Sequence, residues 1–221
     1  MGAAYVLTGS VNQCSHEADV SAPVKELLTQ VRTGDVTMAP CADMFEAGVK
    51  VQVLKRRSLY AVRAAKLYDL YTRYDSLEDI PAATRQQIEQ QWFRQSLDEI
   101  WRSTQEFFKE RNPAELSKAA DNPRHRMALV FRWYLGQSSR WPIVGDTDRV
   151  IDYQVWCGPA MASFNDWVKG SYLEPLEHRS AEQIARNLLE GAALITRAQQ
   201  LRNYGVAVPA AAFRYEARQL S

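Results

Sequence analysis

Apolar residues recur at helical spacing along most of the chain, and residues that begin or end helices flank each apolar stretch. Ser96 with Glu99, and Ser180 with Gln183, match the capping box, in which two side chains satisfy free backbone groups at a helix start. Asn112 and Asn122 each precede a proline, which is favoured at the first helical position. The pattern predicts helices over residues 21–34, 59–74, 96–111, 160–169 and 180–205, and two more that begin at residues 113 and 123.

Two segments have the pattern of β-strands. Residues 3–8 are apolar and run into Gly9-Ser10, and residues 49–53 alternate with period two. A lone strand leaves its backbone groups unpaired, so the first segment indicates either a missing sheet or no strand at all. One strand with a largely helical body is natural for the last part of an α/β barrel with an inserted helical subdomain. Residues 206–221 lack a clear pattern and are expected to form a loose tail.

Charge and composition exclude several classes of protein. Lys and Arg total 27 and Asp and Glu total 26, so the net charge of +1 argues against a nucleic-acid binder, which needs a basic surplus. The chain has no apolar run long enough for a transmembrane helix and no secretory signal, so we expect a cytoplasmic protein that does not enter membranes. Cys14, Cys41 and Cys157 are few, odd in number and widely spaced, which fits a reducing compartment.

Metal and nucleophile chemistry find little support in the sequence. His16, His125 and His178 are far apart, and none belongs to a cluster with the spacing of metal ligands, so no metal site is predicted. Cys14 lies close to His16, but this spacing is not by itself a nucleophile motif.

The junction at Gly9-Ser10 is the first candidate for chemistry. A strand that ends in Gly-Ser presents backbone N–H groups and a hydroxyl at the carboxyl end of a sheet, where parallel barrels hold their active sites and often bind phosphate. An ordinary turn is the alternative, and the pattern alone favours it. Asn12 and Gln13 follow and can donate hydrogen bonds either to a ligand or within the loop.

Three further patterns have both a structural and a functional interpretation. Asp43 and Glu46 are consistent with a short helix capped by Asp43 and ended by Gly48. Residues 152–159 combine polar, aromatic and thiol side chains before a Gly-Pro corner, which indicates either a packed turn or a site. Residues 55–57 are Lys-Arg-Arg, either the solvated start of a helix or a patch for the phosphate of phosphopantetheine or for an acidic carrier protein.

Several of these segments together resemble one family. Residues 8–13, 42–55, 66–71, 127–136, 152–161 and 164–170 look like the PfaD-type enoyl reductases, trans-acting subunits of polyketide and polyunsaturated fatty-acid synthases. The resemblance extends from residue 2 to about residue 205. That family is similar to nitronate monooxygenases, whose (β/α) barrel holds FMN and carries a helical segment near its C-terminal end.

The resemblance implies a fold class and a division of the chain. The expected fold is mainly α, the C-terminal fragment of a (β/α)8 FMN barrel with a helical insertion subdomain. Residues 1–48 would hold the last barrel strand and the following helix, residues 49–149 the helical insertion, and residues 150–205 the return to the barrel and its closing helices. Residues 206–221 would be the tail.

The resemblance also implies site residues and partners. Gly9 and Ser10 match the position that receives the flavin phosphate, Asn12 and Gln13 match a segment that contacts flavin or substrate, and Gly158-Pro159 resembles a substrate-side corner at the barrel rim. NADPH would supply hydride to FMN, and an enoyl thioester on an acyl carrier protein would receive it, with other synthase subunits as partners. The catalytic proton donor would lie upstream of Met1 and is unassigned, so residues 1–221 alone are expected to bind FMN poorly and to be inactive.

The aromatic residues of the insertion would either line an acyl tunnel or pack in a plain helical core; they are Trp101, Phe108, Trp133, Tyr134 and Trp156. Two other functions remain open. One is nitronate-type oxidation on the same scaffold, or the acyltransferase activity that older family labels mention, although the chain has no G-x-S-x-G nucleophile motif. The other is a non-catalytic helical interaction module.

Overall fold

The computed structural model describes residues 7–221, which form two compact units. The central unit is Val36–Trp156, and the terminal unit combines the residues up to Asp35 with Cys157–Ser221. The central unit contains β1 (Val36–Pro40), β2 (Lys50–Leu54), α3 (Tyr60–Arg73), α4 (Ala82–Gln87), the π-helix η2 (Ile88–Phe93), α5 (Leu97–Arg111), α6 (Pro113–Asp121), α7 (Pro123–Val144) and the 3-10 helix η3 (Thr147–Asp152). The terminal unit contains α1 (Ser10–Gln13), α2 (Ala22–Thr29), η1 (Thr33–Asp35), α8 (Ala160–Val168), η4 (Leu176–His178), α9 (Ala181–Asn203) and η5 (Ala210–Phe213).

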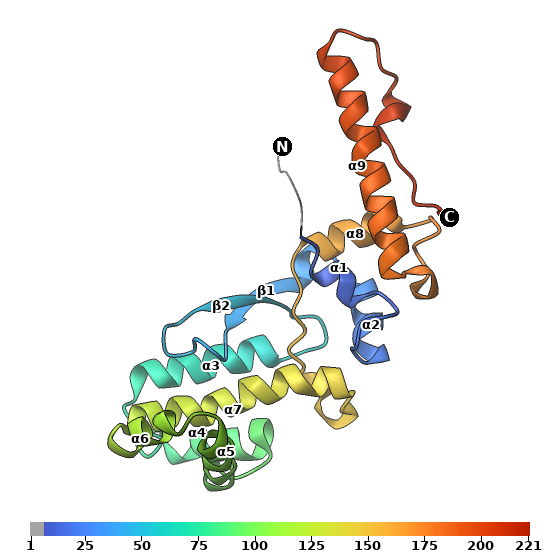
Figure 1. Ribbon diagram of the computed structural model, residues 1–221. Coiled ribbons are helices and arrows are strands. Elements are labelled where there is room, and N and C mark those ends of the chain that lie inside the picture. The colour runs from blue at the N-terminus through green and yellow to red at the C-terminus, as the bar shows by residue number, and fades with distance from the viewer. Residues whose placement is uncertain (1–6) are drawn as a thin grey trace. The chain divides into compact units, whose positions relative to one another are not determined.

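In the central unit a β-hairpin covers a layer of helices. β1 and β2 pair antiparallel, with Val36 opposite Leu54 and Pro40 opposite Lys50. β1 packs on α3, α3 on α7, and α7 on α5 and α6, as Figure 1 shows. Because α7 has neighbours on several sides, its core residues are apolar around the helix rather than along one stripe; they include Leu129, Val130, Phe131, Tyr134 and Leu135, each at most 1% exposed.

Local capping explains where the predicted helices begin. The Ser96 hydroxyl accepts a hydrogen bond from the Glu99 backbone N–H, and the Glu99 carboxylate accepts one from the Ser96 N–H, so the capping box is formed. The Asn122 side chain accepts from the His125 N–H at 3.0 Å, and the Ser180 hydroxyl accepts from the Gln183 N–H at the start of α9. These helix starts confirm the sequence predictions.

The long helix α7 continues through an internal proline. Pro142 lies inside α7 and has no N–H to bond with the Ser138 carbonyl one turn earlier. The Gln154 backbone N–H donates to that carbonyl at 2.8 Å instead, so the acceptor is satisfied from outside the helix. α7 therefore ends only at Gly145, whose φ of 72° is the left-handed conformation that favours glycine.

A buried carboxylate ties three elements of the central unit together. Asp152 is fully buried and accepts hydrogen bonds from Arg63, from the Tyr134 hydroxyl at 2.7 Å and from Arg149 at 3.4 Å. Arg149 also donates to the carbonyls of Trp92 and Phe93 at 2.7 and 2.6 Å. Residues 152–155 of the segment 152–159 are buried, as the packed-turn interpretation predicted, whereas Trp156 is 47% exposed. The Val155 carbonyl accepts from the Leu54 N–H in β2.

Other expectations differ from the structure. The predicted strand at residues 3–8 lies mostly outside the described residues, and Leu7 and Thr8 are not in a strand. The segment at residues 49–53 is a strand, β2, and its partner β1 was not predicted. Residues 43–48 form a turn instead of a short helix, with Gly48 at a φ of 71°.

The C-terminal stretch is packed rather than loose. After α9 the chain turns back and runs along that helix, as Figure 1 shows. The Tyr215 hydroxyl donates to the side chains of Asn187 and Glu190 at 3.1 and 3.0 Å, and Ala217 is 3% exposed. The predicted segment boundaries at 48/49 and 149/150 refer to a complete barrel and remain predictions.

Candidate functional site

The residues predicted to hold flavin phosphate and those at the Gly-Pro corner meet in the terminal unit. The Ser10 Oγ accepts a hydrogen bond from the Gly158 backbone N–H at 2.9 Å, although the two residues are 148 positions apart. Pro159 precedes α8, which packs against α1. The structure thus brings together Ser10, Gly158 and Pro159, which the sequence had assigned to different parts of a site.

Gly9 and Ser10 retain the features that an anion needs. A Cβ added at Gly9 would meet no atom within 4 Å, so the side of the backbone that faces outward there is open among the described residues. The Ser10 oxygen accepts from Gly158, which leaves the hydroxyl proton available to donate to a phosphate oxygen. This arrangement is compatible with a phosphate group beside Gly9 and Ser10.

Asn12 is less suited to a ligand than the sequence predicted. Its side-chain amide donates to the Thr8 carbonyl at 3.0 Å, and its side-chain oxygen accepts from the Thr8 hydroxyl at 3.3 Å. These bonds correspond to the loop interpretation of Asn12. Gln13 is the last residue of α1 and is partly exposed.

A buried arginine that the sequence did not single out supports the end of α1. Arg179 is 1% exposed and donates to the Cys14 Sγ and the Asn165 side chain, both at 3.2 Å, and to the carbonyls of Leu173 and Glu174. Burial raises the pKa of the Cys14 thiol, against the opposing effect of Arg179. Because Cys14 is fully buried, its surroundings are those of a structural thiol.

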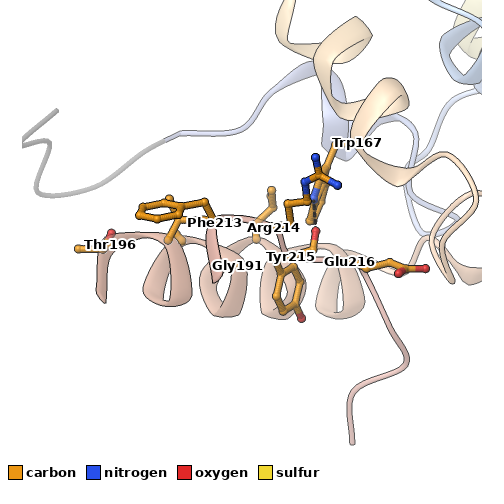
Figure 2. A pocket seen from close by; sticks show the side chains of 10 residues that line it. Trp167, Gly191, Thr196, Phe213, Arg214, Tyr215 and Glu216 are labelled. Atoms are coloured by element: carbon orange, nitrogen blue, oxygen red, sulfur yellow. Dashed lines mark hydrogen bonds between the residues drawn. The ribbon is translucent and has the colours of Figure 1, made fainter. Parts of the chain in front are cut away.

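A groove of about 730 Å³ lies between α9 and the C-terminal stretch of the terminal unit. Figure 2 shows the side chains that line it, with Trp167 above α9 and Tyr215 beside Gly191. The Trp167 Nε1 donates to the Tyr215 carbonyl at 3.0 Å. A Cβ at Gly191 would lie 2.9 Å from the Tyr215 ring, so glycine permits this close approach. These contacts indicate that the groove is the place where the chain's own C-terminal stretch packs against α8 and α9.

A second cavity, of about 690 Å³, lies in the central unit between α5, α7 and the turn at residues 42–43. Phe108 and Trp133, two of the aromatic residues proposed to line a tunnel, line this cavity. Tyr134 instead lies in the core, Trp101 stacks under Arg126, and Trp156 is 47% exposed.

The remaining polar candidates have separate roles. Glu46 lies 3.0 Å from the Nδ1 of the buried His125, and Glu115 lies 3.3 Å from its Nε2, so two carboxylates flank the ring. Asp43 lines the cavity of the central unit. Lys55 and Arg57 are exposed in the turn before α3 and do not line that cavity.

The part of the chain that the structure describes contains no cluster of three or more His, Cys, Asp or Glu side chains arranged to hold a metal ion. Within residues 7–221, no helix combines the length and the apolar character that crossing a membrane requires.

Comparison with known proteins identifies relatives for nearly the whole chain. The family described as "[Acyl-carrier-protein] S-malonyltransferase, inserted helical domain" matches residues 74–153. A subunit of the polyunsaturated fatty acid synthase of Thraustochytrium sp. (strain ATCC 26185 / S-3) is 44% identical over 218 residues, which cover 96% of this chain and 11% of that protein. Polyketide biosynthesis protein PksE of Bacillus subtilis (strain 168) is 43% identical over 195 residues, which cover 88% of this chain and 25% of that protein.

A solved structure has the same fold. The enoyl reductase domain of MlnA, from the macrolactin biosynthesis cluster of Bacillus amyloliquefaciens, superposes with a TM-score of 0.84 at 38% identity and covers 91% of this chain and 45% of that chain. The chain spans about a tenth to a quarter of the length of the two curated relatives. These matches agree with the resemblance and with the mainly α fold class: over most of its length the chain is similar to part of the enoyl reductase domain of MlnA and to parts of a polyunsaturated fatty acid synthase subunit and of a polyketide biosynthesis protein.

Proposed function

We propose that the chain forms part of an FMN-dependent enoyl reductase that reduces enoyl thioesters carried on an acyl carrier protein during polyketide or polyunsaturated fatty-acid biosynthesis. The observation that carries this proposal is the 38% identity to the enoyl reductase domain of MlnA over 91% of the chain. The names of the curated relatives support synthase subunits as partners. NADPH is the proposed source of hydride.

The terminal unit would hold the phosphate of FMN through Gly9 and Ser10. The open space beside Gly9 lets a phosphate approach the backbone, and the Ser10 hydroxyl proton is free to donate to it. Gly158 fixes the Ser10 oxygen at 2.9 Å, so the hydroxyl is oriented before a ligand arrives. FMN, when bound, would supply hydride chemistry that no protein side chain supplies.

Other activities remain as alternatives. The match of residues 74–153 to the inserted helical domain of a malonyltransferase favours acyl transfer as a second candidate, but the chain contains no G-x-S-x-G motif to provide the nucleophile. Nitronate oxidation on the same scaffold is distinguished from enoyl reduction by the substrate that reacts. The proposal predicts NADPH-dependent reduction of a crotonyl carrier thioester and no comparable oxidation of an alkyl nitronate.

The proposed phosphate position is tested by substitution in the longer protein that carries this chain. Gly9→Val should place methyl groups where the phosphate approaches and raise the Kd for FMN by roughly tenfold or more, equivalent to about 1.4 kcal/mol. Gly34→Val is the matched control, because a Cβ at Gly34 also meets no atom within 4 Å. Equal FMN affinity for Gly9→Val and Gly34→Val, measured by fluorescence titration, would remove Gly9 from the site.

A further inference from the structure

The cavity of the central unit is formed by matching faces of two helices. On α7 the lining residues Leu129, Arg132, Gly136 and Arg140 are three or four positions apart, so they share one face. On α5 the lining residues include Thr104, Phe107 and Arg111, which also share a face. The volume of about 690 Å³ is within the range of pockets that bind small organic molecules.

The polar part of the cavity lining carries a surplus of positive charge. Three arginines, Arg111, Arg132 and Arg140, contribute to the lining, and Asp43 is the carboxylate that lies among them. Arg132 forms an ion pair with Glu115, with 3.7 Å between nitrogen and oxygen. Arg140 is exposed and has no ion pair within residues 7–221. Guanidinium groups are well suited to phosphate oxygens, and Arg140 is the one of the three with no ion pair or ring contact among the described residues.

Gly136 keeps the middle of the α7 face open. Glycine inside a helix costs about 1 kcal/mol relative to alanine. A Cβ at Gly136 would meet no atom within 4 Å, so close packing does not account for the glycine. Since Gly136 lies on the lining face halfway between Arg132 and Arg140, which are about 12 Å apart along the helix axis by the rise per residue, a side chain there would obstruct the cavity.

The opposite wall supplies an apolar surface and an unsatisfied hydroxyl. Phe107 is 50% exposed although it is aromatic, and Arg111 stacks over its ring at 4.5 Å. Thr104 is 4% exposed, lines the cavity, and its hydroxyl has no hydrogen-bond partner among the described residues. A buried polar group without a partner is unfavourable, and a bound ligand with amide groups is one means of satisfying it.

We infer that this cavity binds the phosphopantetheine arm that carries the acyl substrate, with its phosphate at the arginines and its extended chain between Phe107 and the α7 face. The arm matches the lining because it joins a phosphate to a flexible chain with apolar and amide groups. The inference rests on the proposed function and adds a subsite to it. The Lys-Arg-Arg sequence at residues 55–57 lies outside the cavity lining, so it is not the phosphate site in this account.

The direct test is calorimetric titration of the 221-residue chain with 4′-phosphopantetheine, with pantetheine, which lacks the phosphate, and with inorganic phosphate. The phosphorylated arm should bind at least tenfold more tightly than either of the other two, which is about 1.4 kcal/mol. Equal affinity for inorganic phosphate would reduce the cavity to a general anion patch and overturn the inference. If pantetheine binds as tightly as 4′-phosphopantetheine, the arginines do not bind the phosphate and the inference is overturned.

Variants separate binding from folding. Gly136→Leu should abolish binding while the helix, relieved of glycine, keeps its thermal stability. Thr104→Val should weaken binding severalfold and leave the melting temperature unchanged or raised, because it removes an unsatisfied buried hydroxyl. Arg140→Gln should weaken binding about tenfold, whereas Arg102→Gln, on α5 outside the lining, should not change it. Wild-type affinity in Gly136→Leu would contradict the inference.

Turnover distinguishes this inference from the proposed function. In the longer protein, Arg140→Gln should raise the KM for a crotonyl carrier thioester, and Arg102→Gln should leave it unchanged. If the wild-type protein reduces that thioester and Arg140→Gln has the wild-type KM, the cavity inference fails alone. If the chain binds phosphopantetheine as described and the wild-type protein reduces no enoyl thioester, the proposed function fails and the cavity remains.

Discussion

The buried Asp152 allows a quantitative test of what holds the central unit together. Asp152→Asn preserves the size of the side chain and removes its charge. Arg63, Tyr134 and Arg149 all donate to this carboxylate, and Asp152 has no exposed surface, so the substitution leaves two guanidinium groups facing a neutral amide. Removing one partner of a buried ion pair typically costs about 3–5 kcal/mol. A domain is stable by only about 5–15 kcal/mol, so the loss is a large fraction.

Urea denaturation followed by tryptophan fluorescence measures this loss. Five of the six tryptophans lie in the central unit, so the signal reports mainly on it. With a slope of about 2 kcal/mol per molar urea, the midpoint of Asp152→Asn should fall by about 1.5–2.5 M. Asp148→Asn, an exposed neighbour on η3, is the control and should change stability by less than about 0.5 kcal/mol.

An Asp152→Asn cost below about 1 kcal/mol would refute the argument that the carboxylate is the counter-charge of the two arginines. Tyr134→Phe provides a milder version if Asp152→Asn does not fold. It removes one hydrogen bond at 2.7 Å and should cost about 1–2 kcal/mol, because it also leaves the carboxylate with one donor fewer. If Tyr134→Phe does not lower the free energy of unfolding measurably, the role given to the Asp152 carboxylate is refuted in the same way.

Three further predictions concern other parts of the chain. Gly191→Ala should displace Tyr215, whose ring would lie 2.9 Å from the new methyl group, and accelerate cleavage of the C-terminal stretch in limited proteolysis; an unchanged cleavage rate would show that the close approach is unimportant. Burial raises the pKa of the Cys157 thiol to about 11, with smaller contributions from neighbouring negative groups. The native thiol should therefore resist alkylation at pH 8. Because the folded state keeps this proton to a higher pH than the unfolded state does, its contribution to the free energy of unfolding is complete below about pH 9 and is lost as the pH rises towards about 11. Rapid native alkylation would contradict this. His125→Ala leaves two carboxylates without the ring between them and should lower the free energy of unfolding by about 1–3 kcal/mol, measured by denaturation; wild-type stability would show that the ring does not connect them.

The features predicted from the sequence are those with local causes. The capping box at Ser96 and the hydroxyl cap at Ser180 need only residues three positions apart, so the helix starts could be identified without tertiary information. β1 has no clear alternation and ends in Pro40, and it becomes a strand because β2 pairs with it. The continuation of α7 through Pro142 depends on Gln154, which lies beyond the end of the helix and satisfies the free carbonyl.

The residues of the candidate site also fall into those with a local sequence signal and those that only the tertiary structure identifies. The local pattern pointed to Gly9-Ser10 and to the Gly158-Pro159 corner, the resemblance gave them their proposed roles, and the contact between Ser10 and Gly158 could be found only from the fold. Arg179 gave no local signal, because an arginine is usually exposed and its partners lie on separate segments. Arg132, Gly136 and Arg140 have helical spacing in the sequence, but that spacing also describes a solvated helix face, so the cavity required the position of α5.

The most direct test of the account is turnover by the longer protein that carries this chain, supplied with FMN, NADPH and a crotonyl thioester on an acyl carrier protein. Mass spectrometry of the carrier should show a butyryl group, two hydrogens heavier than the crotonyl group, formed in step with NADPH consumption. If FMN is bound and the crotonyl group remains unreduced while NADPH is present in excess, the enoyl reductase assignment is wrong.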